Sequence, residues 1–547
     1  MKTKKYKTIR LLGFGFVLLF LISGCEKGFE EMNKSPNEPE DVPTTYLLTD
    51  AQKGLMSFLW DEWWNGRFGM LYSQYWSQAS YTDESRYKPR EGVNNNYWIY
   101  FYAGRDAHPP DGELNGGGMM SLERIIEINT NPETAQLASR YGSNNNQIAV
   151  ARILKAWMFQ ILTDIWGYIP YDQALEVQTY LSPAYDSQQY IYEQLLIELT
   201  EAVAQMDDGK GPAGDLIYNG NMAQWKKFAN SLKLRIAMRM SDVAPDMATT
   251  AINEAVASGI FESNDDNAWL IFEVGKPNNN PLYQNQTERS DFAVSKVLVD
   301  FLEARSDPRL DFYANAPIGS DEHVGFPYGM SNSEATPIST DNVSMPGNVV
   351  YAPQAPGFFM NYDEVCFIMA EASLELGVAG SAQEWYEMGI EASMEMWNMI
   401  LGMTPTGWYR IDNHTTDVLP EAITADDMSA YMADPMVDWN GGEDQMKLIA
   451  EQKYIALYPQ GLQAWFEWRR TTYPDVLVKA GDVISYSIGT ASGEYTFDPL
   501  VDPGDRGIPT RMTYPKEEIT LNQGSYDAAV SAMGGDNFDV KTWWDPN

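Results

Sequence analysis

The chain has very few of the residues on which metal sites and disulfides depend. It contains two Cys and three His in 547 residues. None of the His residues, His108, His323 and His414, has a second His or Cys at metal-ligand spacing, so a zinc hydrolase of the HExxH type is excluded. A G-x-S-x-G elbow, a Gly-rich phosphate loop and a dinucleotide fingerprint are also missing. The sequence signals of the best-known hydrolase and nucleotide-binding classes are therefore absent.

Basic residues are scarce as well. Lys and Arg number 38 against 76 Asp and Glu, for a formal net charge of −38. Five of the basic residues, Lys2, Lys4, Lys5, Lys7 and Arg10, lie at the very start of the chain. The remaining acidic field repels nucleic acid and anionic lipid. A neutral ligand, a cationic ligand or a protein partner is easier to accommodate, and we expect no nucleic-acid partner.

Long apolar runs are limited to one, LLGFGFVLLFLI at residues 11–22, which follows the basic start. It is too short to span a bilayer but matches the core of a secretory signal. Ser23 and Gly24 stand directly before Cys25, and small residues in front of a Cys resemble the bacterial lipoprotein signal. We predict a signal peptide over 1–24 and a membrane anchor of acyl chains on Cys25. Ordinary secretion with a free Cys25 thiol is the alternative.

The segment after this Cys is predicted to be a tether over 25–45, because it is rich in charge, Pro and Asn and has little apolar periodicity. Its acidic residues Glu26, Glu30 and Glu31 resemble the surface-export signal of lipoproteins in the Bacteroides group, although a solvated linker would also be acidic. With Cys25 acylated, Cys366 has no disulfide partner and is expected to be a small buried hydrophobe.

Helical periodicity dominates the rest of the chain. In QIAVARILKAWMFQILTDIWG, apolar residues recur every three or four positions from Ile148 to Trp166. Similar patterns predict helices at about 187–206, 222–240, 246–258, 292–304, 361–377, 381–400, 443–458 and 461–470. Pairs such as 361–377 with 381–400 have the size of a tetratricopeptide unit, about 35 residues. We predict a mostly α fold for a single domain over 46–547, with tetratricopeptide-like helical pairs forming a scaffold, a loop-rich remainder and a few short strands.

Long irregular segments are expected between the helices. They are rich in Asn, Gly, Pro and aromatic residues and cover 81–120, 262–290, 312–360, 402–441 and 472–520. Loops of this length inside a folded protein are usually functional. Short strands are expected around NAWLIFEVG and ISYSIGT, where alternation is brief.

Acidic residues are so numerous that they identify no site. A glycosidase needs only two carboxylates, and 76 acids guarantee accidental neighbours. The loops SNDDN at 263–267 and DPGDRG at 502–507 could supply oxygens to calcium, but neither follows the EF-hand pattern, and solvated loop acids are the default. We therefore expect no catalytic residue, no cofactor and no metal, with calcium as the alternative.

Aromatic residues are the positive signal, with 17 Trp and 32 Tyr. Trp and Tyr rings can stack on the apolar face of a sugar while neighbouring polar groups bond its hydroxyls. LWDEWW, NNNYWIYFY and PLYQNQTERSDF combine both ingredients. If the segments 60–100 and 278–290 meet, they form an aromatic platform. The expected ligand-binding residues are Trp63, Trp64, Tyr97, Trp98 and Tyr283 for stacking, with Asp83, Arg86, Asn280 and Gln284 for hydroxyl or amide bonding.

Seven ordered segments also carry a family resemblance. They are Cys25, ILKAWMFQILTDIWGYIPYDQAL, GDLIYNGNMAQWKKFANSLKLRIAMRMS, SDPRLDFY, NYDEVCFIMAEASLELG, IAEQKYIALYPQGLQAWFEWRRTTYP and IPTRMTYPKEEITLNQGSY. From Cys25 to roughly Tyr526 the chain resembles the SusD/RagB family of outer-membrane lipoproteins, in particular its SusD-like branch. One departure is Ile508, which begins the last segment where an Arg is common.

The resemblance implies a function as well as a fold. Such proteins look like lids on SusC-like, TonB-dependent transporters: lipid-anchored in the outer membrane and facing the exterior, they capture a nutrient, commonly an oligosaccharide, and catalyse no reaction. Peptide cargo, as in some relatives, stays open, and a surface glycosidase or a purely structural tetratricopeptide adaptor are further alternatives. The family segments are scaffold, so the ligand-binding residues above rest on the loops alone.

Overall fold

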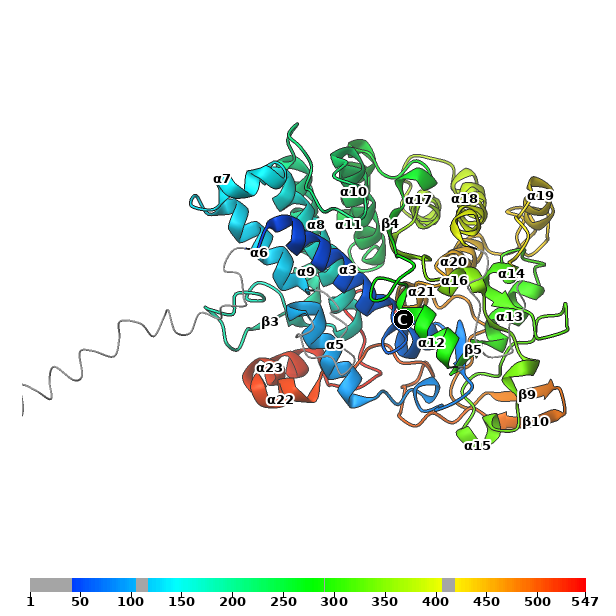
Figure 1. The fold of residues 1–547 in the computed structure, drawn as a ribbon. Helices are drawn as coiled ribbons and strands as arrows, with labels where there is room; N and C mark the ends of the chain where they lie inside the picture. The colour runs from blue at the N-terminus through cyan, green and yellow to red at the C-terminus, as the bar shows by residue number, and fades with distance from the viewer. Residues whose placement is uncertain (1–41, 105–116, 290, 406–418) are drawn as a thin grey trace, which may run out of the picture. The chain divides into compact units, whose positions relative to one another are not determined.

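Helices form most of the backbone, as the periodicity predicted. The computed structural model describes residues 42–104, 117–289, 291–405 and 419–547, and Figure 1 shows its helices and short strands. Thr44–Asn547 form one compact unit. The predicted signal peptide 1–24, Cys25 and most of the tether 25–45 lie outside the described residues. No helix within the described ranges has both the length and the apolar character needed to cross a bilayer.

The scaffold consists of helices packed in pairs, and the predicted mostly α fold with helical pairs is confirmed. The paired helices are α8 (Asn144–Trp166) with α9 (Gln188–Gln205), α10 (Met222–Arg239) with α11 (Pro245–Ser258), α17 (Tyr362–Glu375) with α18 (Ala382–Met403), and α20 (Gln445–Ala456) with α21 (Gly461–Thr471). Successive pairs also touch, since α10 contacts α9 and α17, and α17 contacts α20.

The pair α17 and α18 shows which residues let two helices of the scaffold pack closely. Ser381 caps α18 by accepting a hydrogen bond from the Glu384 backbone. Gly389 of α18 faces the ring of Phe367 in α17, and a Cβ atom at Gly389 would lie only 2.7 Å from that ring. Ala370 in α17 is fully buried. Small side chains therefore let the two helices approach each other.

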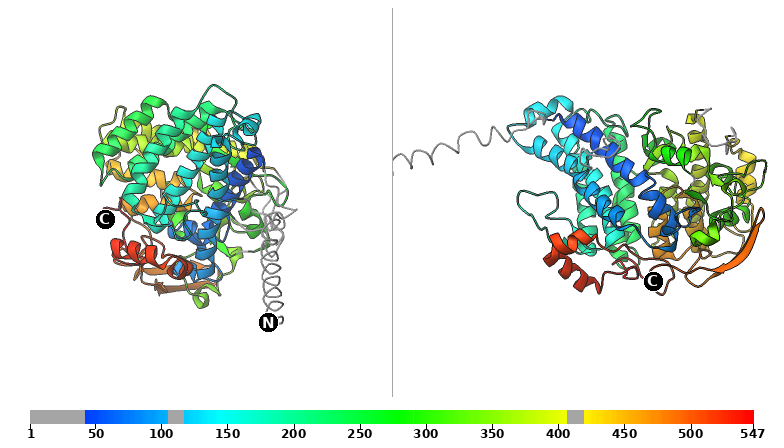
Figure 2. Two further views of the ribbon diagram at one scale, coloured as in Figure 1. Left: turned by 90° about the vertical axis from the view of Figure 1, so that its left-hand side faces the viewer. Right: turned by 60° about the horizontal axis from the view of Figure 1, so that its bottom comes forward.

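Shorter elements complete the described chain. The remaining helices are α3 (Thr44–Trp60), α4 (Met70–Tyr72), α5 (Glu91–Ala103), α6 (Met119–Thr130), α7 (Ala135–Ala138), α12 (Pro281–Glu288), α13 (Lys296–Glu303), α14 (Leu310–Tyr313), α15 (Asn332–Ala335), α16 (Asn348–Tyr351), α19 (Ala425–Met432), α22 (Lys516–Leu521) and α23 (Gln523–Met533), with a π-helical turn η1 (Asn65–Gly69) and the 3₁₀ turns η2 (Glu84–Arg86), η3 (Ser139–Tyr141), η4 (Asn264–Asp266) and η5 (Thr340–Asn342). Figures 1 and 2 show α22 and α23, in red, beside α5, which α22 contacts.

Within the described ranges, the named strands pair as two-stranded antiparallel sheets. They are β1 (Trp76–Gln78) with β5 (Phe292–Val294), β2 (Ile169–Pro170) with β3 (Tyr185–Asp186), β4 (Ala268–Ile271) with β8 (Pro356–Met360), β6 (Ala314–Asn315) with β7 (Met345–Pro346), and β9 (Val483–Ile488) with β10 (Ala491–Thr496). β4 and β9 fall in the two segments where strands were expected. The helix predicted at 292–304 starts later, at Lys296, because its first residues form β5.

Several segments predicted to be irregular contain helices; α12 lies within 262–290 and α19 lies within 402–441. The segment 81–120 was expected to be irregular, but Glu91–Ala103 form α5. Its buried residues, Asn94, Tyr97, Trp98 and Phe101, follow one another at steps of three, one and three, which is a helical stripe. Three consecutive Asn residues, which favour turns over helix interiors, hid that stripe. The helix ends at Gly104, whose φ of 87° favours glycine.

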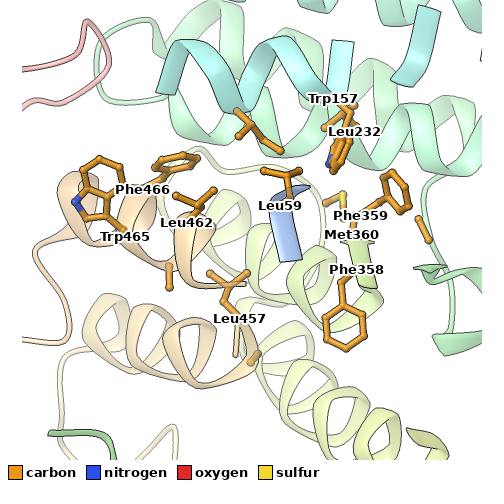
Figure 3. Close-up of a cluster of buried hydrophobic side chains, with 14 of the residues drawn as sticks. Leu59, Trp157, Leu232, Phe358, Phe359, Met360, Leu457, Leu462, Trp465 and Phe466 are labelled. Carbon is orange, nitrogen blue, oxygen red and sulfur yellow. The ribbon is translucent and has the colours of Figure 1, made fainter. Parts of the chain in front are cut away.

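The hydrophobic core lies where the helical pairs meet α3 and β8. Figure 3 shows Leu59 of α3, Trp157 of α8 and Leu232 of α10 close to side chains of β8 and of α21. Leu457 and Leu462, from the turn between α20 and α21 and from α21 itself, approach the same cluster. Side chains from the beginning, middle and end of the chain therefore share one core.

A buried cluster of charges joins the same helices. The carboxylate of Glu467 on α21 accepts from Arg239 (2.7 Å), Lys453 (2.9 Å) and Arg470 (2.9 Å), and all four side chains are buried. Arg239 also binds Asp164 of α8 at 2.8 Å. Although burial alone would raise the pKa of Glu467, the positive charges of Lys453, Arg470 and Arg239 hold that pKa well below its ordinary value.

Replacing Glu467 by Gln is expected to destabilise the protein by about 3–5 kcal/mol at neutral pH, because three buried cations then lose their shared counter-charge. The ionised carboxylate stabilises the folded state fully above its ordinary pKa, near 4.5, and this stabilisation is lost as the pH falls toward the depressed folded-state pKa. The difference from wild type in urea denaturation should therefore shrink in acid. The exposed Glu133→Gln is the control, and equal stability of both variants would contradict this account.

Candidate functional site

Two segments that are distant in the sequence meet beside β1 and β5. Trp76 pairs with Val294, and the Ala79 amide donates to the Asp291 carbonyl at 2.8 Å. The Cζ atom of Arg289 lies 5.5 Å from the centre of the Tyr81 ring. The condition set for an aromatic platform, that the segments 60–100 and 278–290 meet, is therefore fulfilled at Tyr81 and Arg289.

Trp63 is the exposed ring of the LWDEWW segment, with 41% of its surface accessible. The guanidinium of Arg67 lies 4.6 Å from the centre of its ring, and that of Arg90 lies 5.5 Å away. Both distances fit cation–π interactions. Arg67 is itself buried and bonded to Glu84 at 3.2 Å, and Arg90 binds the same carboxylate at 2.6 Å. Trp63 is thus held by two arginines that share one buried acid.

Tyr81 supplies a second exposed ring, with 56% of its surface accessible. Its φ of 56° places it in a left-handed turn that projects the side chain from the loop. Arg289 lies over the ring and binds Asp291 at 2.9 Å, while Asp291 also faces Arg67 at 3.5 Å. Tyr81 was not predicted; the signal that could have found it is a Tyr in a polar segment between two predicted elements.

These side chains define the surface on which the functional argument rests. The Trp63–Tyr81 surface comprises Trp63, Tyr81, Arg67, Arg90 and Arg289. Glu84 and Asp291 compensate its arginines from beneath. It therefore offers two aromatic faces and guanidinium donors on a framework fixed by buried ion pairs.

Three rings predicted to stack on a ligand lie in the protein interior. The prediction that they form part of an exposed platform is therefore wrong. Trp64 is fully buried and stacked on Tyr97, with ring centres 5.1 Å apart and planes 13° apart. Trp98 packs edge-on against Trp166, with ring centres 5.0 Å apart. The inward stripe of α5 carries Tyr97 and Trp98 into the core. The partly buried Tyr283 packs against the edge of that core.

Most of the polar side chains predicted to bond the ligand instead form hydrogen bonds or ion pairs within the protein. Asn280 is fully buried; its side chain donates to the Ala355 carbonyl at 3.2 Å and accepts from the Leu282 amide at 2.9 Å, capping α12. It is not exposed to bond a ligand, contrary to the prediction. Arg86 donates twice to the Asp498 carbonyl, at 2.8 and 3.0 Å. The half-exposed Asp83 faces Lys88 at 3.3 Å. The side chain of Gln284 lies outside the described part of the chain.

Two adjacent carboxyl groups beside Trp63 have unusual electrostatics. Asp61 accepts from the Trp64 amide at 2.7 Å and from the Tyr97 hydroxyl. Burial, with a contribution from the charge of Glu62, raises the pKa of Asp61 to about 8. Burial also raises the pKa of Glu62 to about 7, against the attraction of Arg67. Near neutral pH both groups therefore hold protons for much of the time and can donate hydrogen bonds.

In each loop considered for calcium, one acid bonds to groups of the protein. Asp266 binds Lys227 at 2.9 Å and accepts from the Glu262 amide at 2.8 Å. Asp502 accepts from the Gly504 amide at 3.0 Å. Among the residues that the structure describes, no group of three or more His, Cys, Asp or Glu is placed to hold a metal ion.

Comparisons with known proteins agree on the fold. A family profile described as "Starch-binding associating with outer membrane", SusD-like, matches residues 36–488. The chain is similar to a solved chitin-binding protein at 26% identity and a TM-score of 0.72, over 92% of this chain and 100% of that chain. A SusD-like protein of Bacteroidetes AC2a shares 21% identity with a TM-score of 0.73, over 92% and 100%. A chitin-binding SusD homologue from Flavobacterium johnsoniae shares 24% identity with a TM-score of 0.67, over 92% and 98%. The comparison with curated proteins gives no match.

The two neighbouring tryptophans should differ sharply when replaced by Ala. Trp64→Ala removes a fully buried ring and is expected to cost about 3–5 kcal/mol of unfolding free energy. Trp63→Ala removes an exposed ring and its cation–π contacts, for a cost of about 1 kcal/mol or less. Urea denaturation of both variants measures the difference. Equal losses would place both rings in the same environment and contradict the structure.

Asp61→Asn should flatten the dependence of stability on pH. The pKa of Asp61 in the folded protein, about 8, is above its ordinary value of 3.8. Between these two pH values the folded protein therefore holds a proton that the unfolded chain has lost. The free energy of unfolding falls as the pH rises from the lower value to the higher one. An Asn amide resembles the protonated carboxyl and cannot ionise. We expect Asp61→Asn to gain stability relative to wild type from about pH 4 to about pH 8. The half-exposed Asp83→Asn is the control, and parallel curves for Asp61→Asn and wild type would contradict this.

Proposed function

Because the chain belongs to the SusD-like family of binding proteins, we propose that it captures an oligosaccharide at the Trp63–Tyr81 surface and delivers it to a SusC-like, TonB-dependent transporter. Proteins of this family bind their targets and are not enzymes, and they need no cofactor. The proposal concerns the ligand, the surface that binds it and the partner that receives it.

The observation that carries the proposal is an exposed indole that is already held in place. A flat ring supported by buried ion pairs loses little conformational entropy when a sugar face packs against it. Arg90, whose Nε is bonded to Glu84 below, can direct its other N–H groups to sugar hydroxyls or to an amide oxygen. The chitin-binding relative at 26% identity supports N-acetylated sugar chains as the first ligands to test.

The cellular setting is part of the proposal. The family is described as associating with the outer membrane. Removal of residues 1–24 and acylation of Cys25 would anchor the protein there by lipid, facing the cell exterior, as the small residues before Cys25 support. The acidic tether would then separate the folded unit from the anchor.

Isothermal titration with chitohexaose tests the surface, with maltohexaose as a second glycan. Trp63→Ala and Tyr81→Ala are each expected to weaken binding about tenfold, equivalent to about 1.4 kcal/mol, because each removes a stacking face. Tyr180→Ala removes a similarly exposed ring from the loop between β2 and β3 and should leave the affinity unchanged. Melting temperatures of the three variants show that they are folded.

Three results would contradict this function. Undiminished glycan binding by Trp63→Ala and Tyr81→Ala would move the site elsewhere. Binding of basic peptides that Trp63→Ala and Tyr81→Ala weaken, with no binding of glycan, would establish the peptide alternative. Shortening of the glycan on incubation, followed by chromatography, would identify a glycosidase.

A further inference from the structure

A second candidate binding surface lies on the scaffold, among helices that the Trp63–Tyr81 surface does not include. A groove of about 770 Å³ runs between α9 and α11, with α10 in contact with both helices. Its apolar lining comes from Leu196 and Ile197 of α9 and from Met247 and Ala251 of α11. Lys233 of α10 lies at its base, with its side chain almost fully buried.

The apolar lining is open to solvent. Ile197 is 50% exposed and Met247 is 40% exposed, while Leu196 and Ala251 are buried beneath them. These residues follow the helical spacing of a face that ordinarily packs against a neighbouring element. Among the described residues, no element packs against this face. Two large hydrophobic side chains, one from each wall, are therefore available to a partner.

Acidic side chains accompany the apolar lining on both walls. Glu254 binds Lys233 at 2.6 Å, and Glu201 binds Arg152 at 2.7 Å, so these two charges are compensated. Among the described residues, no ion pair compensates Glu193 on α9 or Asp246 on α11. The groove thus combines an apolar interior with one carboxylate on each side that has no ion-pair partner among the described residues; Glu193 accepts only from Gln189, at 2.9 Å, and Asp246 lies in the first turn of α11.

We propose that this groove binds a basic amphipathic helix of a protein partner. The apolar face of that helix would cover Ile197 and Met247, and its Lys or Arg side chains would pair with Glu193 and Asp246, in the helix-in-groove mode of recognition. The wall from Glu193 to Glu201 is about 12 Å long at 1.5 Å per residue, which accommodates about two helical turns. A second copy of this chain is disfavoured as occupant, because two bodies of net charge −38 repel each other.

Fluorescence anisotropy with a labelled synthetic helix tests the groove. The probe has about three turns, with Leu along one face and Lys on both flanks; the control peptide carries Glu in place of every Lys. We expect the Lys peptide to bind the full chain, Ile197→Arg and Met247→Arg to weaken it at least about tenfold, and the Glu peptide not to bind.

The control variant separates the groove from the general attraction of a basic peptide to an acidic protein. Val256→Arg adds the same charge to α11 at a similarly exposed residue that does not line the groove, and it should change the affinity less than about twofold. All three substituted side chains are exposed, and melting temperatures confirm folding. Equal weakening by Val256→Arg and Met247→Arg, equal binding of both peptides, or no binding of the Lys peptide would overturn the proposal. Size-exclusion with light scattering that shows a dimer broken by Met247→Arg would assign the groove to a second copy and overturn it as well.

Discussion

The convergence of three cations on the buried carboxylate of Glu467 constrains the rest of the molecule. A carboxylate away from water is tolerated only with its counter-charges in place, so α21 is fixed relative to α10 and α20. At the other end of α21, Gly461 lies against Gly69 of η1 so closely that a Cβ atom at Gly461 would be 2.3 Å from the Gly69 carbonyl carbon. Since η1 contains Arg67, the buried charges of the scaffold set the position of the arginine that supports Trp63.

The Trp63–Tyr81 surface and the groove between α9 and α11 differ in their charge. At the Trp63–Tyr81 surface, Glu84 and Asp291 offset two of the three arginine charges, so the rings stand on a base with a small positive charge within a strongly acidic protein. Such a base lets a neutral ligand approach without a large desolvation cost. In the groove between α9 and α11, Glu193 and Asp246 have no ion-pair partner among the described residues, so their charges favour a basic partner over an acidic one. One scaffold can therefore serve a neutral ligand and a charged partner at separate places.

The scaffold was predictable from sequence because its signal is periodic. The stripe from Ile148 to Trp166 gives the end of α8 correctly, although the helix begins four residues earlier, at Asn144, and the paired helices follow for the same reason. The orientation of individual rings was not predictable. Trp63 and Trp64 are adjacent, and which of them turns outward depends on the Asp61 side chain bonding the Trp64 amide and on the π-helical turn that follows. Such choices arise from contacts between distant segments, which composition and spacing do not encode.

The carboxyl groups beside Trp63 also explain why this site suits binding rather than bond cleavage. Raised pKa values near a cleft often mark a general acid, and a glycosidase needs two carboxyl groups facing the same bond. Here the oxygens of Asp61 already accept from the Trp64 amide and the Tyr97 hydroxyl, inside the aromatic cluster. Glu84 is buried and bonded to Arg67 and Arg90. Two of these three acids are therefore engaged in holding the rings and arginines in place, and Glu62 bonds its own backbone amide in the field of Arg67 and Asp291.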